Sequence, residues 1–102
     1  GRSVRSPSMN IRSLRHKGLR RFVEADNARG IRPDLVNRIR NILAMLISAS
    51  DIDAVKGPPG WHIHPLVGDR SDTWSISASG NWRITFRIDK DEICDLDLED
   101  YH

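Results

Sequence analysis

The spacing of apolar residues changes from helical to alternating within this 102-residue chain, and this change restricts its fold more than any other feature. From Leu35 to Ile47 the apolar side chains recur three and four positions apart, which places them on one face of a helix. After Gly60 they recur at every second position, as in strands with one buried face. A shorter helical pattern covers 16–25, and a weak alternation covers 9–14. We therefore predict one strand, two helices and a meander of three or four antiparallel strands.

Turn-forming residues separate these segments. Pro33 suits the first turn of the second helix, where its missing N–H needs no partner. Gly-Pro-Pro-Gly at 57–60 ends that helix, 68–72 is a turn cluster, and Ser-Gly-Asn at 79–81 indicates a tight hairpin. Helices followed by a mostly antiparallel sheet predict an α+β domain with both helices packed on one face of the sheet.

The length suits a single domain. No apolar run approaches the roughly 20 residues of a membrane helix, and none suggests export. Cys94 is the only cysteine, so an internal disulfide is excluded. Residues 1–8 lack an apolar period and precede Met9, so we interpret them as a disordered expression-tag remnant and 9–102 as the domain.

Charge is unevenly distributed, although the formal net charge is only +2. Residues 9–50 carry nine Lys or Arg against three acids, a formal +6, whereas 51–102 carry five against eleven, a formal −6. A basic first half indicates an anionic partner for one surface.

Alternation predicts a polar face on the sheet. His62 and His64 are two residues apart on the strand expected after the Gly-rich turn, so they share a face. Arg83, Thr85 and Arg87 share a face of the strand after the hairpin. The simpler interpretation is that the imidazoles are solvated and the arginines pair with acids of the last strand. No third ligand accompanies the two histidines at a convincing spacing, so no metal site is predicted.

Other candidates have two interpretations as well. Lys17, Arg20 and Arg21 lie on the polar side of the first helix, either as a solvated face or as phosphate contacts. The three tryptophans alternate with aliphatic residues and are expected in the core. Cys94 shares its alternation with the two leucines that follow it, which predicts a buried thiol without chemistry.

Several motifs together resemble a known family. They are Ile-Arg-Ser-Leu-Arg-His-Lys-Gly-Leu at 11–19, His-Pro-Leu at 64–66, Gly-Asp-Arg at 68–70, Trp-Ser-Ile at 74–76, Asn-Trp-Arg-Ile-Thr-Phe at 81–86 and Glu-Asp-Tyr-His at 99–102. The chain resembles HigB-type toxins of the RelE/ParE superfamily of bacterial toxin–antitoxin systems, and the resemblance covers 9–102.

The resemblance implies a ribosome-dependent mRNA endoribonuclease (mRNA interferase) that inhibits translation by cutting mRNA in the A site, without metal or cofactor. It also implies a RelE-like (microbial RNase-like) fold, with two N-terminal helices on a twisted, mostly antiparallel sheet. The catalytic groups that carry over are His64, Arg83, Asp100, Tyr101 and His102. The residues expected to contact RNA are Lys17, Arg20, Arg21, His62 and Arg87.

Metal-free RNA cleavage needs a base, an acid and a positive charge at the phosphorane. Histidine is present in both protonation states near neutrality, so His64 and His102 are the acid–base candidates, in either order. The planar guanidinium of Arg83 matches phosphate oxygens. Tyr101 would position the substrate or stack on a base, and Asp100 would orient His102 or stabilise its protonated form.

Val67 is a departure from the family pattern. Family members commonly read His-Pro-Leu-Lys-Gly, and here Val67 replaces the lysine expected to contact the phosphate. Losing one such electrostatic stabiliser costs on the order of 10²–10³ in rate, which His62 would offset in part. Two alternatives therefore stay open: a catalytically weakened toxin that acts by binding only, and a ParE-like gyrase poison. His64 and the terminal Tyr-His argue against the gyrase poison.

The resemblance also implies partners. A HigA-type helix-turn-helix antitoxin would bind the toxin, and their complex would contact operator DNA. The 70S ribosome and mRNA would be the targets, in the bacterial cytoplasm, with no membrane partner.

Overall fold

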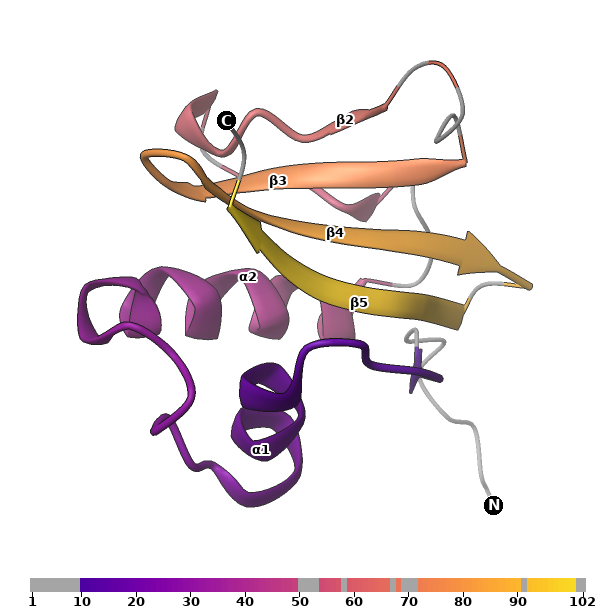
Figure 1. Ribbon diagram of the computed structural model, residues 1–102. Helices are drawn as coiled ribbons and strands as arrows, with labels where there is room; N and C mark the ends of the chain where they lie inside the picture. The colour runs from indigo at the N-terminus through magenta and orange to yellow at the C-terminus, as the bar shows by residue number, and fades with distance from the viewer. Residues whose placement is uncertain are drawn as a thin grey trace.

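The computed structural model describes residues 10–49, 54–57, 59–66, 68, 72–90 and 92–100. Helices and a five-stranded sheet form an α+β domain (Figure 1). The elements are β1 (Asn10–Ile11), α1 (Lys17–Ala25), η1 (Pro33–Leu35), α2 (Val36–Ser48), η3 (Pro59–Trp61), β2 (His64–Pro65), β3 (Thr73–Ser79), β4 (Trp82–Asp89) and β5 (Glu92–Asp100). The predicted class and the mostly antiparallel sheet are confirmed. The predictions for residues 1–8, Val67, Tyr101, His102 and most of the 68–72 turn lie outside the described residues.

Both helices begin and end as local chemistry dictates. The His16 ring caps α1, because its Nδ1 accepts the Leu19 N–H at 3.1 Å. Asp26 ends the helix in the left-handed conformation at φ 53°. Pro33 opens the 3-10 turn η1, which leads into α2. None of the described helices is long and apolar enough to span a membrane.

One hydrophobic core joins helices and sheet. The apolar stripe of α2 buries Ile39, Ile42 and Leu46 completely, and α2 lies against β3. Leu19 of α1 belongs to the same cluster, as do Ile76, Ile84, Phe86, Leu96 and Leu98 of the strands. Burial of these apolar side chains is the main favourable contribution to folding.

The strand order is β1-β5-β4-β3-β2, with β1 and β5 parallel and the other pairs antiparallel. The weak alternation at 9–14 produces only the short β1 and an isolated bridge from Leu14 to Leu96. Backbone bonds nevertheless hold this segment along β5, including Arg12 N–H to the Ile93 carbonyl at 2.7 Å. The tight hairpin predicted at 79–81 is confirmed: Ser79 pairs with Trp82, and Gly80 and Asn81 form the turn between them.

A bulge in β5 corrects the prediction for Cys94. The register shifts by one residue between Thr85 and Arg87, and Asp95 adopts φ 54° there. Cys94 therefore lies opposite Arg87 and outside the hydrophobic cluster that contains Leu96 and Leu98. The thiol is buried, as predicted. The prediction that Cys94 lies on the same face as those leucines is wrong, because the extra residue at the bulge moves the residues that precede it in β5 to the opposite face.

The strand expected after Gly60 is also corrected. Trp61 ends the 3-10 turn η3, and of the residues described between η3 and β3 only His64 and Pro65 form strand pairs with β3. His62 has φ 48°, a left-handed conformation that interrupts the regular alternation of a strand. The prediction that one strand carries His62 and His64 on the same face is therefore wrong at His62.

Candidate active site

A cleft of about 570 Å³ opens where β2, β3 and the start of β4 meet. Its lining residues are His62, His64, Pro65, Leu66, Ser75, Ser77, Gly80, Asn81, Trp82 and Arg83. We call it the His64–Arg83 cleft. It combines a histidine and an arginine with backbone and hydroxyl groups, which are the residue types that acid–base chemistry on a phosphate needs.

Strand register places the side chains of His64 and Arg83 on one face. His64 lies opposite Ser75, which lies opposite Thr85 on β4. Ser77 lies opposite Arg83 in the next row. Because paired residues project to the same side of a sheet, the His64 imidazole and the Arg83 guanidinium share the polar face, as alternation along β4 predicts for Arg83.

The backbone of His62 orients the ring of His64. The Nδ1 atom of His64 lies 2.6 Å from the His62 carbonyl oxygen. A carbonyl can only accept, so this hydrogen bond requires a proton on Nδ1 and leaves Nε2 of the neutral ring as the basic nitrogen. His62, whose carbonyl contacts the His64 ring, has the left-handed conformation, and its side chain lines the same cleft.

Arg83 is held beside the last strand. Its Nη2 lies 3.5 Å from Oε1 of Glu99, and the Arg83 side chain is only 17% exposed. Glu99 also accepts a hydrogen bond from the Thr85 hydroxyl at 2.5 Å. The predicted pairing of the β4 arginines with acids of the last strand is confirmed for Arg83.

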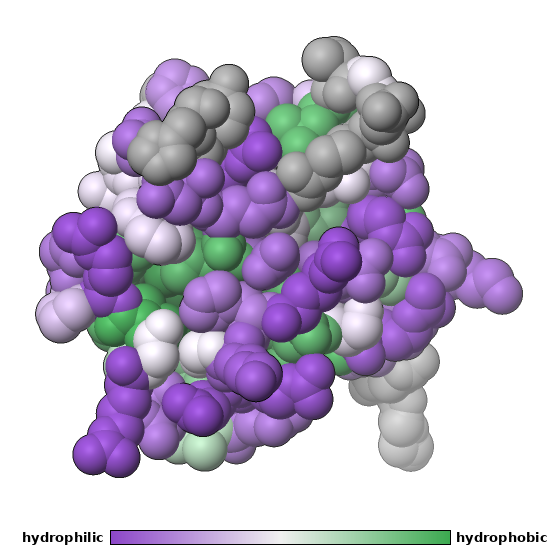
Figure 2. All heavy atoms as spheres, in the orientation of Figure 1, coloured by the Kyte–Doolittle hydropathy of each residue, from purple (hydrophilic) through white to green (hydrophobic). Residues whose placement is uncertain are grey.

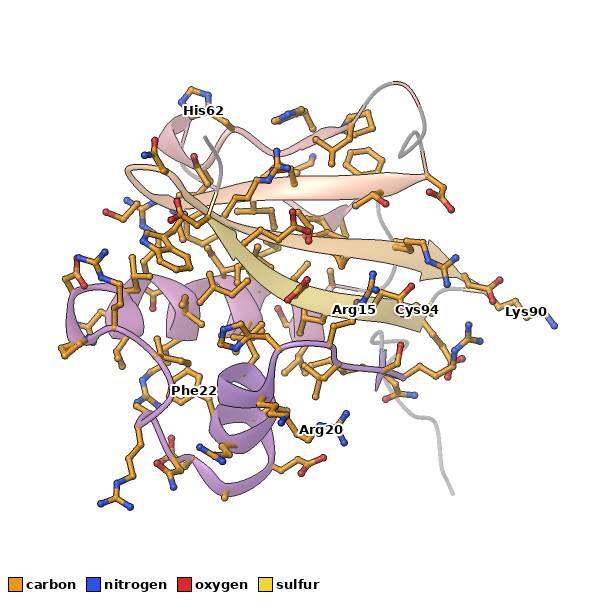
Figure 3. The ribbon with its side chains drawn as sticks, in the orientation of Figure 1. Arg15, Arg20, Phe22, His62, Lys90 and Cys94 are labelled. Carbon is orange, nitrogen blue, oxygen red and sulfur yellow. The ribbon has the colours of Figure 1, made fainter. Side chains whose placement is uncertain are left out.

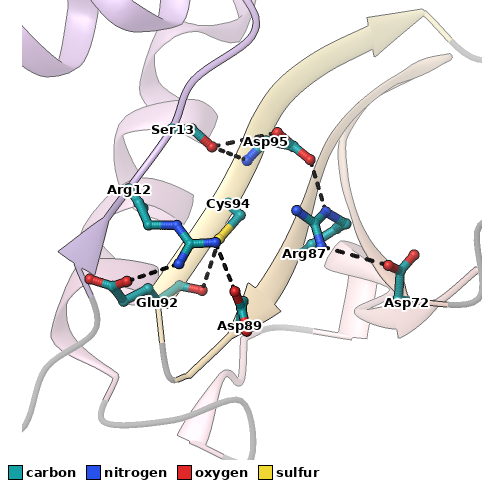
Figure 4. Close-up of polar contacts among 8 residues, drawn as sticks. All are labelled: Arg12, Ser13, Asp72, Arg87, Asp89, Glu92, Cys94 and Asp95. Atoms are coloured by element: carbon teal, nitrogen blue, oxygen red, sulfur yellow. Dashed lines mark hydrogen bonds and ion pairs between the residues drawn. The ribbon is translucent and has the colours of Figure 1, made fainter.

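Arg87 lies at a second cavity of the same face. Its Nε donates to Asp95 at 2.8 Å and its Nη1 lies 3.8 Å from Asp72 (Figure 4). The bond from Arg87 lowers the pKa of Asp95, and the same bond raises the pKa of Arg87. This cavity of about 190 Å³, which we call the Arg87 cavity, is also lined by Asp97 and Glu99. The structure therefore separates Arg87 from the His64–Arg83 cleft and surrounds it with acids.

The basic residues of α1 lie on another part of the surface. Lys17, Arg20 and Arg21 are exposed, and Arg20 also donates to the Leu14 carbonyl at 3.0 Å. Figure 3 places Arg20 beside α1 and His62 beyond β2, on opposite sides of the sheet in that view. Hydrophilic residues cover most of the face seen in Figure 2. The α1 cations are thus available for contacts outside the cleft.

The end of β5 reaches the hairpin that borders the cleft. Asp100 lies opposite Trp82, and both residues line an adjoining cavity of about 310 Å³ with Arg32. The Arg32 guanidinium lies 5.9 Å from the centroid of the Trp82 ring. Tyr101 and His102, which follow Asp100 in the sequence, lie outside the described residues.

Several lining residues had no assigned role at the sequence level. Ser75, Ser77, Asn81 and Trp82 line the cleft because neighbouring strands bring them there. The Asn-Trp-Arg motif indicated two of them, whereas no local signal indicated the serines. Within the described ranges, no three His, Cys, Asp or Glu side chains gather as a metal site.

Fold and cleft together define a small α+β domain with a histidine and an arginine in one cleft on one sheet face. The sequence model of one family, described as the RelE-like toxin of the type II toxin–antitoxin system HigB, matches residues 12–102. The chain belongs to this family of HigB-like toxins. It is 37% identical over 92 residues to the Endoribonuclease HigB of Proteus vulgaris, covering 90% of this chain and 99% of that protein.

Proposed function

We propose that residues 9–102 form a toxin domain that cuts mRNA in the ribosomal A site, within the RelE-like (microbial RNase-like) arrangement of helices packed on a twisted sheet. Family and relative support a type II toxin with endoribonuclease activity. The observation that carries the proposal is the presence of His64 and Arg83 on one face of one cleft. The core shared by α1, α2 and the strands supports the helix arrangement.

In this proposal His64 exchanges a proton with the ribose 2′-oxygen or with the leaving 5′-oxygen. The hydrogen bond at its Nδ1 leaves Nε2 free for that exchange. Arg83 stabilises the charge of the phosphorane. His102 is the second acid–base group, Asp100 orients it or stabilises its protonated form, and Tyr101 positions or stacks on the RNA. The position of Asp100 opposite Trp82, beside the cleft, supports this assignment.

Ribosome dependence has a physical basis in this proposal. A site with few catalytic groups gains most from a partner that holds mRNA in a reactive geometry. Lys17, Arg20 and Arg21 supply contacts to ribosomal RNA phosphates, while His62 and Arg87 contact RNA from the sheet face. The target places the action in the bacterial cytoplasm.

Membership of a toxin–antitoxin family implies an antitoxin partner. We further propose that this partner is a HigA-type helix-turn-helix protein and that operator DNA is contacted only through the complex. Val67 in place of the usual lysine supports reduced catalytic power, whereas His64 and the terminal Tyr-His argue against a gyrase target.

The test is primer-extension mapping of cuts in ribosome-bound and naked mRNA. We expect cuts in ribosome-bound mRNA only, and a loss of about 10²-fold or more for His64→Ala and Arg83→Ala. Lys90→Asn is the matched control, because it removes an exposed cation at a left-handed position that asparagine tolerates. Wild-type cleavage by both cleft variants would contradict the site, and equal cutting of naked RNA would contradict ribosome dependence. A gain of cleavage in Val67→Lys would establish a weakened site.

A further inference from the structure

Glu99 stands between the two cavities of the polar face. Arg83 lines the His64–Arg83 cleft, and Glu99 lines the Arg87 cavity. The two residues are direct cross-strand partners, with Arg83 Nη2 at 3.5 Å from Glu99 Oε1. Their pair therefore forms part of the wall between the cavities, with the guanidinium on the side of the cleft.

The carboxylate of Glu99 is itself held in place. Its Oε2 accepts the hydroxyl of Thr85 at 2.5 Å, and Thr85 is 1% exposed in the middle of the sheet. The Glu99 side chain is 24% exposed, so water screens this network less than an ordinary surface pair. A short bond to a buried strand residue restricts the carboxylate, and the carboxylate in turn restricts the arginine.

We propose that Glu99, anchored by Thr85, is a positioning residue that fixes the Arg83 guanidinium for the reacting phosphate. The inference rests on the proposed role of Arg83. Arginine has several rotatable bonds, and holding it in one conformation before substrate binds removes that entropy cost from the catalytic step. Glu99 acts through Arg83 and does not touch the substrate.

Charge and position make opposite predictions for Glu99. Its negative charge partly cancels that of Arg83, so a purely electrostatic role predicts faster cleavage when the carboxylate is removed. Positioning predicts slower cleavage, because a displacement near 1 Å of a catalytic group costs up to about 10²-fold. The amide of Glu99→Gln keeps an acceptor for Arg83 but removes the charge, so it separates the two roles.

The experiment measures single-turnover cleavage of mRNA bound to ribosomes, as a function of toxin concentration. For Glu99→Ala we expect a rate at saturation about tenfold below wild type, with half-saturation nearly unchanged. Glu99→Gln should restore most of this rate, and Thr85→Val should fall between Glu99→Ala and wild type. Asp97→Ala is the matched control, because Asp97 is a half-buried acid on the same face of β5 and lies opposite Thr85 rather than Arg83.

A double-mutant cycle with Arg83→Ala separates positioning from general destabilisation. If Glu99 acts through Arg83, Glu99→Ala causes no further loss in the Arg83→Ala background. The inference would be overturned if the losses of Glu99→Ala and Arg83→Ala multiply in the double mutant. It would also be overturned if Glu99→Ala cleaves at the wild-type rate or faster, or if Asp97→Ala loses as much activity as Glu99→Ala. Wild-type cleavage by Arg83→Ala would instead show that the proposed role of Arg83 is wrong, and the positioning role would be overturned with it.

Discussion

The contact between Gly18 and Gly30 is a sensitive point for the placement of α1. A Cβ atom added at Gly18 would lie 2.4 Å from the Gly30 carbonyl oxygen and 2.8 Å from its carbonyl carbon. Both atoms belong to the backbone, so no side-chain rotation can relieve the overlap. The same Cβ would lie 2.8 Å from Cε1 of His16, the residue that caps the helix.

The magnitude follows from two opposing effects of Gly18→Ala. Alanine gains up to about 1 kcal/mol of helix propensity over glycine. Forcing an extra carbon into a packed contact costs about 1–3 kcal/mol, with more expected when backbone must move. We expect a net loss of about 2 kcal/mol in the free energy of unfolding, which lowers the Tm by roughly 8–16 °C for a domain of this size.

Thermal and urea unfolding followed by circular dichroism measures this change. Gly60→Ala is the control, because a Cβ there meets nothing within 4 Å, and it should melt at or slightly above the wild-type temperature. If Gly18→Ala melts at or above wild type, the close approach of the two backbones is wrong. The packing of α1 against the 26–30 loop would then be wrong as well.

Two further predictions concern the sheet. Phe86 is fully buried in β4, so Phe86→Ala should lower the free energy of unfolding by about 3–5 kcal/mol in urea titrations, and a loss below about 1 kcal/mol would argue against its place in the core. The second prediction concerns pH. Hydrogen bonds from Arg12 and Arg87 lower the pKa values of Asp89 and Asp95, respectively. Both acids therefore stabilise the fold above the unfolded aspartate pKa of about 4, and this stabilisation is lost as the pH falls through their lower folded pKa values. Asp95→Asn, which suits the left-handed backbone at φ 54°, should therefore flatten the fall of Tm below about pH 4, and an unchanged slope would contradict the Arg87–Asp95 pair.

Local patterns were sufficient for the elements whose stability is local. The i, i+3, i+4 spacing between Leu35 and Ile47 identified α2, because a helix repeats every 3.6 residues whatever it packs against. The Gly80-Asn81 turn was found for a similar reason, since its conformation depends on glycine at φ 54°. Alternation along β4 likewise placed Arg83 and Thr85 on one face.

The errors occur where the backbone departs from a regular period. Alternation predicted a strand that includes His62, but the φ of 48° at His62 interrupts the strand geometry. The carbonyl of His62 instead contacts the His64 ring. The bulge at Asp95 moved Cys94 to the face of Arg87. Both are single-residue departures from a regular period. Asp95 contacts Ser13 and Arg87, and Ser13 is too distant in the sequence for a local pattern to include it.

For this protein the sequence by itself determined the α+β class, the two helices and the hairpin, and the motifs of the family resemblance predicted His64 and Arg83 as site residues. Each depends on a short repeat or on a motif of adjacent residues. Only the tertiary structure decided that His64 and Arg83 line one cleft, that Glu99 stands behind Arg83, and that Arg87 belongs to a separate acidic cavity. The physical reason is strand register: pairing joins residues distant in the sequence, and one bulged residue changes which side chains meet.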